Sequence, residues 1–243
     1  MEKVYERNKL LANFNTSFCP GCMHGTAVKL ICEVATELGI EDSIVGVMPI
    51  GCSVQWGMFV NFDTFGVPHG RAAATATGYK RNRPDNVLVV YQGDGDCSSI
   101  GLCETVHAAN RGENFTVIMI NNQVYGMTGG QAAPTTLPGQ KTTTSQAGKN
   151  IEEMGNPLNL AEMIAGLPTP KYVTRQTLHT PKGVLAAKKA IKKAFEIQID
   201  GGGYSFVELL SACPTNWKMT PGNAVKYMNE VVTKQYPVGD LKG

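Results

Sequence analysis

Two cysteines near the start of the chain have a spacing that three kinds of site share. Cys19 and Cys22 flank a Pro-Gly pair, so their thiols could form half of a metal site, a redox-active dithiol or a disulfide. The chain has 7 cysteines, and its first residues show no export signal, which argues against a disulfide framework. A redox-active dithiol of this spacing would be expected to follow a strand, and no strand is predicted before Cys19. The outcome depends on whether the fold brings more cysteines to this turn.

Polar motifs follow two apolar segments in the middle of the chain. Residues 86–91 lead into Gly-Asp-Gly at 93–95, and residues 115–121 lead into Asn122. Parallel strands here would bring both motifs to the sheet edge where α/β proteins bind ligands. The glycines would let the backbone approach a phosphate closely. Three oxygen donors could then form a Mg²⁺ shell with diphosphate and water: the Asp94 carboxylate, the Asn122 amide and the Val124 carbonyl.

The elements that must position these residues alternate between strand and helix. Apolar strands are predicted at 43–48, 86–91, 115–121, 172–177 and 204–210. Helical patterns are predicted at 23–38, 70–80, 98–110, 158–165 and 182–199. Because the strands are apolar throughout, we expect them to be buried on both faces. The alternation predicts a single α/β domain over 1–243, with three α/β/α layers and a mostly parallel sheet.

Two segments depart from this alternation. Residues 128–150 are rich in Gly, Pro, Thr and Gln, which is typical of an active-site or interface loop or of a disordered segment. Residues 214–243, with a short helix near 222–233, are predicted to form a C-terminal arm rather than part of the core.

The charge pattern excludes some classes of partner. The net charge is +2, and no Lys/Arg cluster indicates a nucleic-acid or polybasic membrane surface. No apolar run reaches the length of a membrane span. We therefore expect a cytoplasmic protein that binds neither nucleic acid nor membrane.

Several motifs together resemble a known family. Gly-Asp-Gly, 25 further residues and Asn-Asn, at 93–122, are similar to the thiamine diphosphate motif. The CPGC, IGCS, YGMTGGQ and CPTNW segments extend the likeness from Cys19 to Trp217. The chain thus resembles the β subunit of 2-oxoacid:ferredoxin oxidoreductases, which implies the diphosphate-side half of a thiamine diphosphate-binding fold.

The resemblance implies a role for each motif. Asp94, Asn122 and the Val124 carbonyl would hold Mg²⁺. The cofactor pocket would be formed by Ile50, Gly51, Cys52, Ser53, His69, Gly95, Asp96, Gly126 and Met127. Catalytic contacts to substrate or cofactor would come from His69, Thr128 and Gln131.

The same resemblance adds two cysteines to the first pair. Cys52 and Cys213 would join Cys19 and Cys22 as ligands of a [4Fe–4S] cluster. A tetrahedral zinc site would use the same four thiols, and the residues alone do not separate the two.

The implied activity is the coenzyme A-dependent oxidative decarboxylation of a 2-oxo acid, with electrons passed to ferredoxin. The substrate would be a branched-chain 2-oxo acid or 2-oxoglutarate. The chain would work only with partners: an α subunit that carries the pyrimidine-side site and an activating glutamate, and γ and ferredoxin-like δ subunits. The alternatives are an iron–sulfur electron-transfer subunit without cofactor chemistry of its own, and a Mg²⁺-dependent phosphotransferase.

Overall fold

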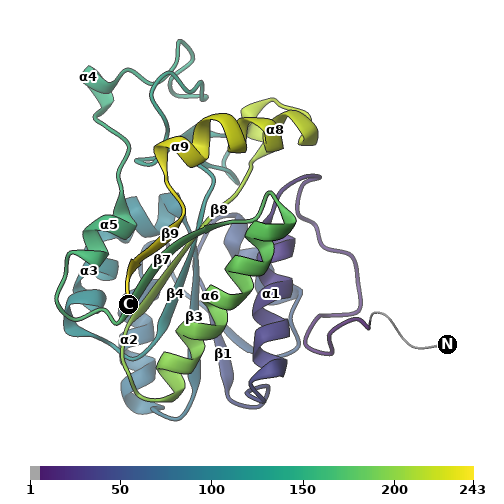
Figure 1. Cartoon of the computed structure of the whole chain (residues 1–243), viewed down its shortest axis with the longest axis vertical. Coiled ribbons are helices and arrows are strands. Elements are labelled where there is room, and N and C mark those ends of the chain that lie inside the picture. The colour runs from purple at the N-terminus through teal and green to yellow at the C-terminus, as the bar shows by residue number, and fades with distance from the viewer. Residues whose placement is uncertain (1–5) are drawn as a thin grey trace.

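A seven-stranded sheet crosses the centre of the molecule (Figure 1). The structure is a computed structural model and describes residues 6–243. The strand order is β2-β1-β3-β4-β8-β7-β9, and neighbours are parallel except that β9 runs antiparallel to β7. The strands are β1 (Ile44–Met48), β2 (Asp63–Gly66), β3 (Val87–Gly93), β4 (Thr116–Asn121), β7 (Tyr172–Thr177), β8 (Ser205–Leu210) and β9 (Gly239–Lys242).

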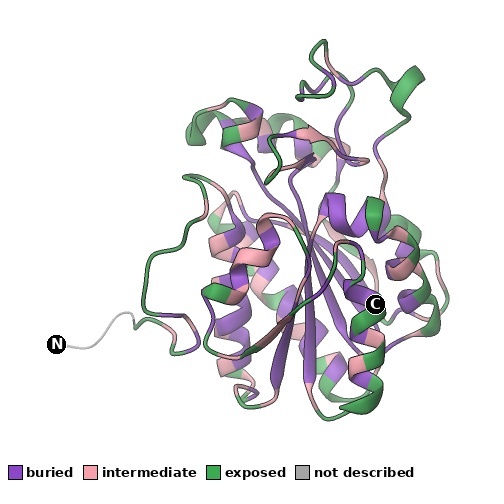
Figure 2. Ribbon diagram, turned by 180° about the vertical axis from the view of Figure 1, so that it is seen from behind, coloured by how far each residue is buried: buried purple, intermediate pink, exposed green. Residues whose placement is uncertain are grey.

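Helices cover both faces of this sheet, which confirms the predicted three layers (Figure 1). One layer holds α1 (His24–Glu37) and α6 (Pro181–Ile199), and the other holds α2 (Ala72–Asn82), α3 (Leu102–Arg111) and α5 (Leu160–Ala165). Alternate strand residues face opposite layers. In β3, Val89 and Tyr91 belong to the core under α1 and α6, and Leu88 and Val90 to the core on the other face. The five inner strands, β1, β3, β4, β8 and β7, are accordingly buried along almost all of their length, whereas the edge strands β2 and β9 are not (Figure 2).

All the predicted strands and helices are present, but one helix begins differently. Instead of α-helix from residue 98, a π-helical turn at Asp96–Ile100 precedes α3. Its closing bond runs from Gly101 N to Asp96 O over 2.7 Å. A β-carbon at Gly101 would lie 2.8 Å from the Gly70 carbonyl, so the wide turn depends on glycine at this crossing. Such π turns often occur at functional sites.

The C-terminal segment is part of the core, contrary to the prediction of an arm. It contains α7 (Pro214–Trp217), α8 (Pro221–Tyr227), a π turn (Met228–Val232), α9 (Thr233–Gln235) and β9. Every fourth side chain is fully buried, at Ala224, Met228, Val232 and Tyr236. This spacing is one face of a helix. The short helix predicted near 222–233 is present, but the prediction did not recognise that this face is buried. β9 then extends the sheet beyond β7.

The segment at 128–150 is a loop, as predicted, although its base is buried. It begins in a short antiparallel hairpin, β5 (Val124–Tyr125) and β6 (Gln131–Ala132). Thr135, Thr136 and Leu137 then lie within the protein. The rest projects beyond the sheet toward α4 (Ile151–Met154), at the top of Figure 1. No helix within residues 6–243 combines the length and apolar character needed to cross a membrane.

Candidate active site at the carboxyl edge of the sheet

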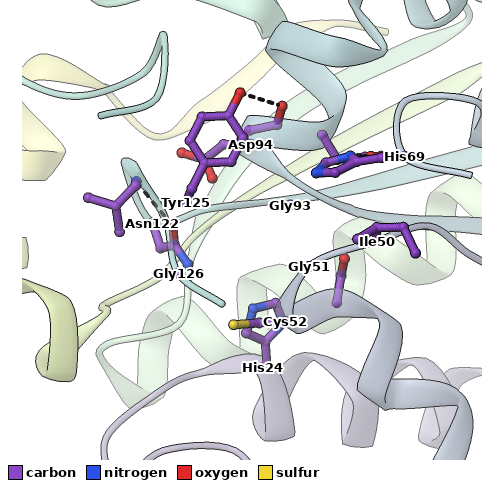
Figure 3. Close-up of a pocket in the computed structure, with 14 residues that line it drawn as sticks. His24, Ile50, Gly51, Cys52, His69, Gly93, Asp94, Asn122, Tyr125 and Gly126 are labelled. Atoms are coloured by element: carbon purple, nitrogen blue, oxygen red, sulfur yellow. Dashed lines mark hydrogen bonds and ion pairs between the residues drawn. The ribbon is translucent and has the colours of Figure 1, made fainter. Parts of the chain in front are cut away.

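The ends of β1, β3 and β4 surround a small cavity that we call the Asp94 cavity (Figure 3). Its volume is about 30 Å³. All the residues predicted to bind magnesium or thiamine diphosphate line it, except Met127. Of the four predicted cluster cysteines, only Cys52 lines it. The lining residues are His24, Ile50, Gly51, Cys52, Ser53, His69, Gly93, Asp94, Gly95, Asp96, Asn122, Val124, Tyr125 and Gly126.

Asp94 is a fully buried carboxylate in this cavity. The Thr135 hydroxyl donates a hydrogen bond to its Oδ2 atom. Burial raises the pKa of the Asp94 carboxyl to about 7, although the Thr135 hydroxyl and the N–H groups of Gly95 and Gln123 act in the opposite direction. No lysine or arginine lines the cavity. A cation beside Asp94 would therefore favour the ionised form strongly.

Asn122 and Val124 are held close to Asp94 by the turn that follows β4. The Val124 N–H donates to Asn122 Oδ1 over 3.3 Å, and the Trp217 indole donates to the Asn122 carbonyl over 3.1 Å. Gln123 lies between them with a φ of 60°, in the left-handed region that non-glycine residues seldom adopt. The turn thus places both Asn122 and Val124 on the wall of one cavity.

His69 lies at the rim of the cavity and is held by Asp96. Its Nδ1 atom contacts Asp96 Oδ1, which also accepts the Gly70 N–H over 2.7 Å. Gln92 donates to the other oxygen of Asp96 over 2.5 Å. The buried carboxylate of Asp96 therefore fixes the loop that carries His69, leaving Nε2 as the ring nitrogen without this bond.

Tyr125 covers Gly95, a contact that sequence analysis did not anticipate. The Tyr125 hydroxyl donates to the Gly95 carbonyl over 3.2 Å. A β-carbon at Gly95 would lie only 2.3 Å from the Tyr125 ring, so the close approach requires glycine. The Tyr in YGMTGGQ was the available signal, but its sequence position says nothing about which way the ring points.

The four predicted cysteine ligands line a second cavity, which we call the thiol cavity. Its volume is about 280 Å³, and Cys19, Cys22, Cys52 and Cys213 all contribute to its wall. All seven cysteines of the chain are free. The thiol cavity adjoins the Asp94 cavity, because both are lined by His24, Cys52, Asn122 and Gly126.

Local contacts explain how distant segments reach this cavity. The Cys22 N–H donates to the Cys19 carbonyl over 3.0 Å and closes the Pro-Gly turn just before α1. Asn216 in α7 donates to Cys213 Sγ over 3.3 Å and to the Gly126 carbonyl over 2.9 Å. Asn216 thus ties the segment after β8 to the turn after β4.

Burial and mutual repulsion oppose ionisation of these thiols. Burial raises the pKa of Cys22 to about 12 and that of Cys52 to about 11, and neighbouring thiolates add to both shifts. The pKa of Cys213 is raised for the same reasons, against hydrogen bonds from Asn216. Metal binding here would have to release protons. Within residues 6–243, no three His, Cys, Asp or Glu side chains are grouped closely enough to hold a single metal ion.

Three predicted contacts lie outside the Asp94 cavity. Met127 lines the thiol cavity instead and is 46% exposed. Thr128 and Gln131 line neither cavity and bond to each other, from Thr128 Oγ1 to Gln131 Oε1 over 2.5 Å and from Gln131 Nε2 to the Thr128 carbonyl over 2.8 Å. Thr128 lies in the exposed turn of the β5–β6 hairpin, and Gln131 is the half-buried first residue of β6.

Comparison with known proteins places this geometry in a family. Residues 50–209 match the model for the C-terminal TPP binding domain of thiamine pyrophosphate enzymes. The 2-oxoglutarate synthase subunit KorB of Archaeoglobus fulgidus is 37% identical over 93% of this chain and 79% of its own length. The chain belongs to the 2-oxoacid:ferredoxin oxidoreductase β-subunit family. The resemblance found in the sequence is thereby confirmed.

Two further relatives of this β-subunit family member define how far the likeness extends. The ketoisovalerate oxidoreductase subunit VorA of Methanothermobacter thermautotrophicus is 45% identical over 100% of the chain, and the chain spans 51% of its length. A 2-oxoglutarate:ferredoxin oxidoreductase from Magnetococcus marinus, solved with 2-oxoglutarate, coenzyme A and succinyl-CoA bound, superposes with a TM-score of 0.78. That match is 26% identical and covers 99% of this chain and 85% of the other.

Proposed function

We propose that this chain is the β subunit of an enzyme that oxidises a 2-oxo acid with coenzyme A. The products would be an acyl-CoA, CO₂ and two electrons, which ferredoxin accepts. The observation that carries this proposal is the wall of four residues between the oxygen-lined Asp94 cavity and the thiol cavity. An electron acceptor is useful to a decarboxylating cofactor only at short range, and these two cavities adjoin.

The relatives support two classes of substrate. Identity is 45% with a ketoisovalerate oxidoreductase subunit and 37% with a 2-oxoglutarate synthase subunit. We propose a branched-chain 2-oxo acid as the preferred substrate, with 2-oxoglutarate as the second candidate. Comparison of kcat/KM for the two acids in the assembled enzyme distinguishes them.

The residues around Asp94 fit magnesium thiamine diphosphate. The donor set of carboxylate, amide and backbone carbonyl consists of the hard oxygens that Mg²⁺ prefers. The Ser53 hydroxyl is buried without a hydrogen-bond partner among the described residues, and it lines the cavity. β-Carbons built at Gly51 and Gly93 would meet no atom within 4 Å, so the backbone there is open to an anion. Asp94, Asn122 and the Val124 carbonyl would hold the metal, and Ile50–Ser53, Gly95, Asp96 and Gly126 would surround the diphosphate.

The thiol cavity fits a [4Fe–4S] cluster. Four cysteine thiols around one cavity are the donor set of such a cluster. Asn216 donates to Cys213 Sγ, and hydrogen bonds to cluster sulfurs tune the reduction potential. Cys19, Cys22, Cys52 and Cys213 would each provide one ligand.

The bound groups would supply the chemistry that side chains lack, namely a carbon nucleophile for decarboxylation from thiamine diphosphate and one-electron acceptance from the iron–sulfur cluster. The chain's own residues would orient and shield. Asp96 would hold His69 so that Nε2 is available to cofactor or substrate. His24 stacks on Phe18 and contacts the Tyr91 hydroxyl over 2.7 Å. In this position it would help to exclude water from both cavities. Thr128 or Gln131 could contact substrate after their mutual bonds open.

Partners would complete the enzyme. We propose that an α subunit supplies the pyrimidine-side site with its activating glutamate, together with γ and ferredoxin-like δ subunits. The Asp94 cavity supports this proposal, because within residues 6–243 it lies at the edge of one mostly parallel seven-stranded sheet, enough for one half of a cofactor site. The VorA relative has about twice the length of this chain.

The test is the Asp94→Ala variant in the complex purified anaerobically with its partner subunits. We expect at least a 100-fold loss of thiamine diphosphate affinity, because the substitution removes the carboxylate from the metal shell. Iron and sulfide content should stay near that of the unmodified protein. Asp42→Ala, at an exposed turn before β1, is the matched control and should change neither quantity. Retention of thiamine diphosphate by Asp94→Ala would instead favour an electron-transfer subunit without cofactor chemistry.

A further inference from the structure

The turn between the two proposed magnesium ligands after β4 has a strained backbone. Gln123 lies between Asn122 and Val124, with φ at 60°. A left-handed conformation costs a non-glycine residue about 1–2 kcal/mol. Strain of this kind persists only where surrounding contacts hold it. The side chain and the carbonyl of Gln123 show which contacts do so.

Asn121 and Thr136 hold Gln123 from both sides. The Gln123 Nε2 atom donates to the Asn121 carbonyl over 2.8 Å and to Asn121 Oδ1 over 2.9 Å. The Gln123 N–H also faces Asn121 Oδ1, at 3.3 Å. On the other side the Thr136 hydroxyl donates to the Gln123 carbonyl over 2.6 Å. Asn121, Gln123 and Thr136 are all fully buried.

Asn121 is itself oriented by a buried ion pair. Its Nδ2 atom donates to Glu208 Oε1 over 2.7 Å, and Arg175 Nε donates to the other Glu208 oxygen over 2.8 Å. Arg175 and Glu208 are direct neighbours across β7 and β8. The donor bond to Glu208 decides the amide orientation of Asn121, so that its Oδ1 atom faces Gln123.

The far side of Arg175 is fixed as well. Its two terminal nitrogens make a bidentate pair with Glu162 at 2.7 and 2.6 Å, and one of them also donates to the Pro237 carbonyl over 3.2 Å. Arg175 therefore has little freedom to turn away from Glu208. A continuous chain of hydrogen bonds and ion pairs thus leads from α5 through β7, β8 and the end of β4 to the strained turn.

We propose that Glu208 and Asn121 are positioning residues for the metal site: through Gln123 they hold the Asn122 amide and the Val124 carbonyl in ligating positions. This inference rests on the proposed function, because it concerns the same Mg²⁺ site. Partners that orient metal ligands typically contribute 10–100-fold to metal affinity.

The test uses the Gln123→Ala and Glu208→Gln variants in the purified complex. Gln123→Ala leaves the backbone of the turn in sequence but removes the two side-chain bonds to Asn121. Glu208→Gln keeps the volume but places an amide where Arg175 and Asn121 both need an acceptor. Mg²⁺ is titrated at saturating thiamine diphosphate, and the melting temperature is measured without either ligand. We expect each variant to weaken Mg²⁺ binding about 10–100-fold.

A matched control separates positioning from general loss of stability. Gln198 is also fully buried, and it bonds to the Leu88 N–H and carbonyl and to Thr116 Oγ1, at the opposite ends of β3 and β4. Gln198→Glu should lower the melting temperature at least as much as the two test variants while leaving the Mg²⁺ affinity unchanged.

Each outcome decides the matter. Mg²⁺ affinities within twofold of the unmodified protein for both test variants, or an equal loss in Gln198→Glu, would overturn the positioning role. If Glu208→Gln does not fold, Gln123→Ala alone decides, because it removes no charge and leaves the Arg175–Glu208 ion pair in place. If the unmodified complex binds no Mg²⁺ with thiamine diphosphate, the proposed function fails and this inference falls with it. Loss of binding in Asp94→Ala with normal binding in both test variants overturns the inference alone.

Discussion

The two adjoining cavities are assembled in different ways. The Asp94 cavity is small, is lined largely by backbone and oxygen donors, and is formed by loops that directly follow β1, β3 and β4. The thiol cavity is about nine times larger, as 280 Å³ against 30 Å³, and takes its sulfurs from three separate segments. Cys52 belongs to both walls. One cavity is thus a local product of strand ends, and the other is a product of topology.

This difference determines how each cavity can be lost. A substitution in the Asp94 cavity would alter the proposed magnesium ligand shell, which short turns hold in place. The loss of a single donor atom should therefore weaken binding. In the thiol cavity, each of four cysteines would supply one donor. Replacement of one cysteine should therefore either abolish the iron–sulfur content or leave it unchanged. Because only Cys52, among the four cysteines, lines both cavities, substitutions at the other three should separate the two functions.

The largest effect is expected for Cys213→Ser. The substitution removes one of the four proposed cluster ligands, so iron and sulfide should fall to near zero in protein purified anaerobically. Thiamine diphosphate content should stay within twofold of normal, because Cys213 does not line the Asp94 cavity. Both contents are measured on the same sample by metal analysis and by cofactor extraction.

Cys103→Ser is the control for that substitution. Cys103 is exposed and lies in α3, away from both cavities. It should retain iron and thiamine diphosphate. A full iron content in Cys213→Ser would show that the four thiols do not act as one ligand set.

A smaller effect is expected for Gly95→Ala. The new methyl group would lie 2.3 Å from the Tyr125 ring, so the ring must move, and overpacking of this kind costs about 1–3 kcal/mol. Urea denaturation should report this loss, together with weaker thiamine diphosphate binding and unchanged iron. Gly78→Ala is the matched control: it meets no atom within 4 Å in the middle of α2, and it should gain about 0.5–1 kcal/mol. Equal stability of the two variants would mean that Tyr125 does not pack on Gly95.

The sequence predicted the Asp94 cavity well because its signals are local. Each continuous apolar run predicts a strand, and the Gly-Asp-Gly or Asn-Asn motif at its end identifies the polar residues that the strand positions. Parallel pairing of β1, β3 and β4 then brings the motifs together. What local patterns could not supply was the partner of each group. Thr135 reaches Asp94 from a loop 41 residues away, and nothing in its neighbourhood marks it.

The thiol cavity was predicted only through the resemblance to a family. Cys213 lies far beyond Cys22 in the sequence, and no regular spacing relates the two residues. The C-terminal segment failed for a related reason. Ala224, Met228, Val232 and Tyr236 form a helical stripe, but Pro, Gly and charged residues around it obscured the pattern. The strands β2 and β9 were not predicted, because they are short and lack a continuous apolar run. Both lie at the edges of the sheet, where they are only partly buried.

The smallest effect is expected for Tyr236→Phe, which tests whether the C-terminal segment supports the Asp94 side. The buried Tyr236 hydroxyl donates to the Thr135 carbonyl over 2.8 Å, and Thr135 in turn donates to Asp94. Loss of one buried hydrogen bond costs about 1 kcal/mol, which urea denaturation resolves. Tyr79→Phe is the control, because its hydroxyl accepts only a long bond of 3.4 Å from Asn86 and should change stability by less than about 0.5 kcal/mol. If Tyr236→Phe is as stable as Tyr79→Phe, the segment packs against the site without holding it. If it loses stability and binds thiamine diphosphate more weakly while iron stays constant, the oxygen-lined cavity depends on the end of the chain, and the thiol cavity does not.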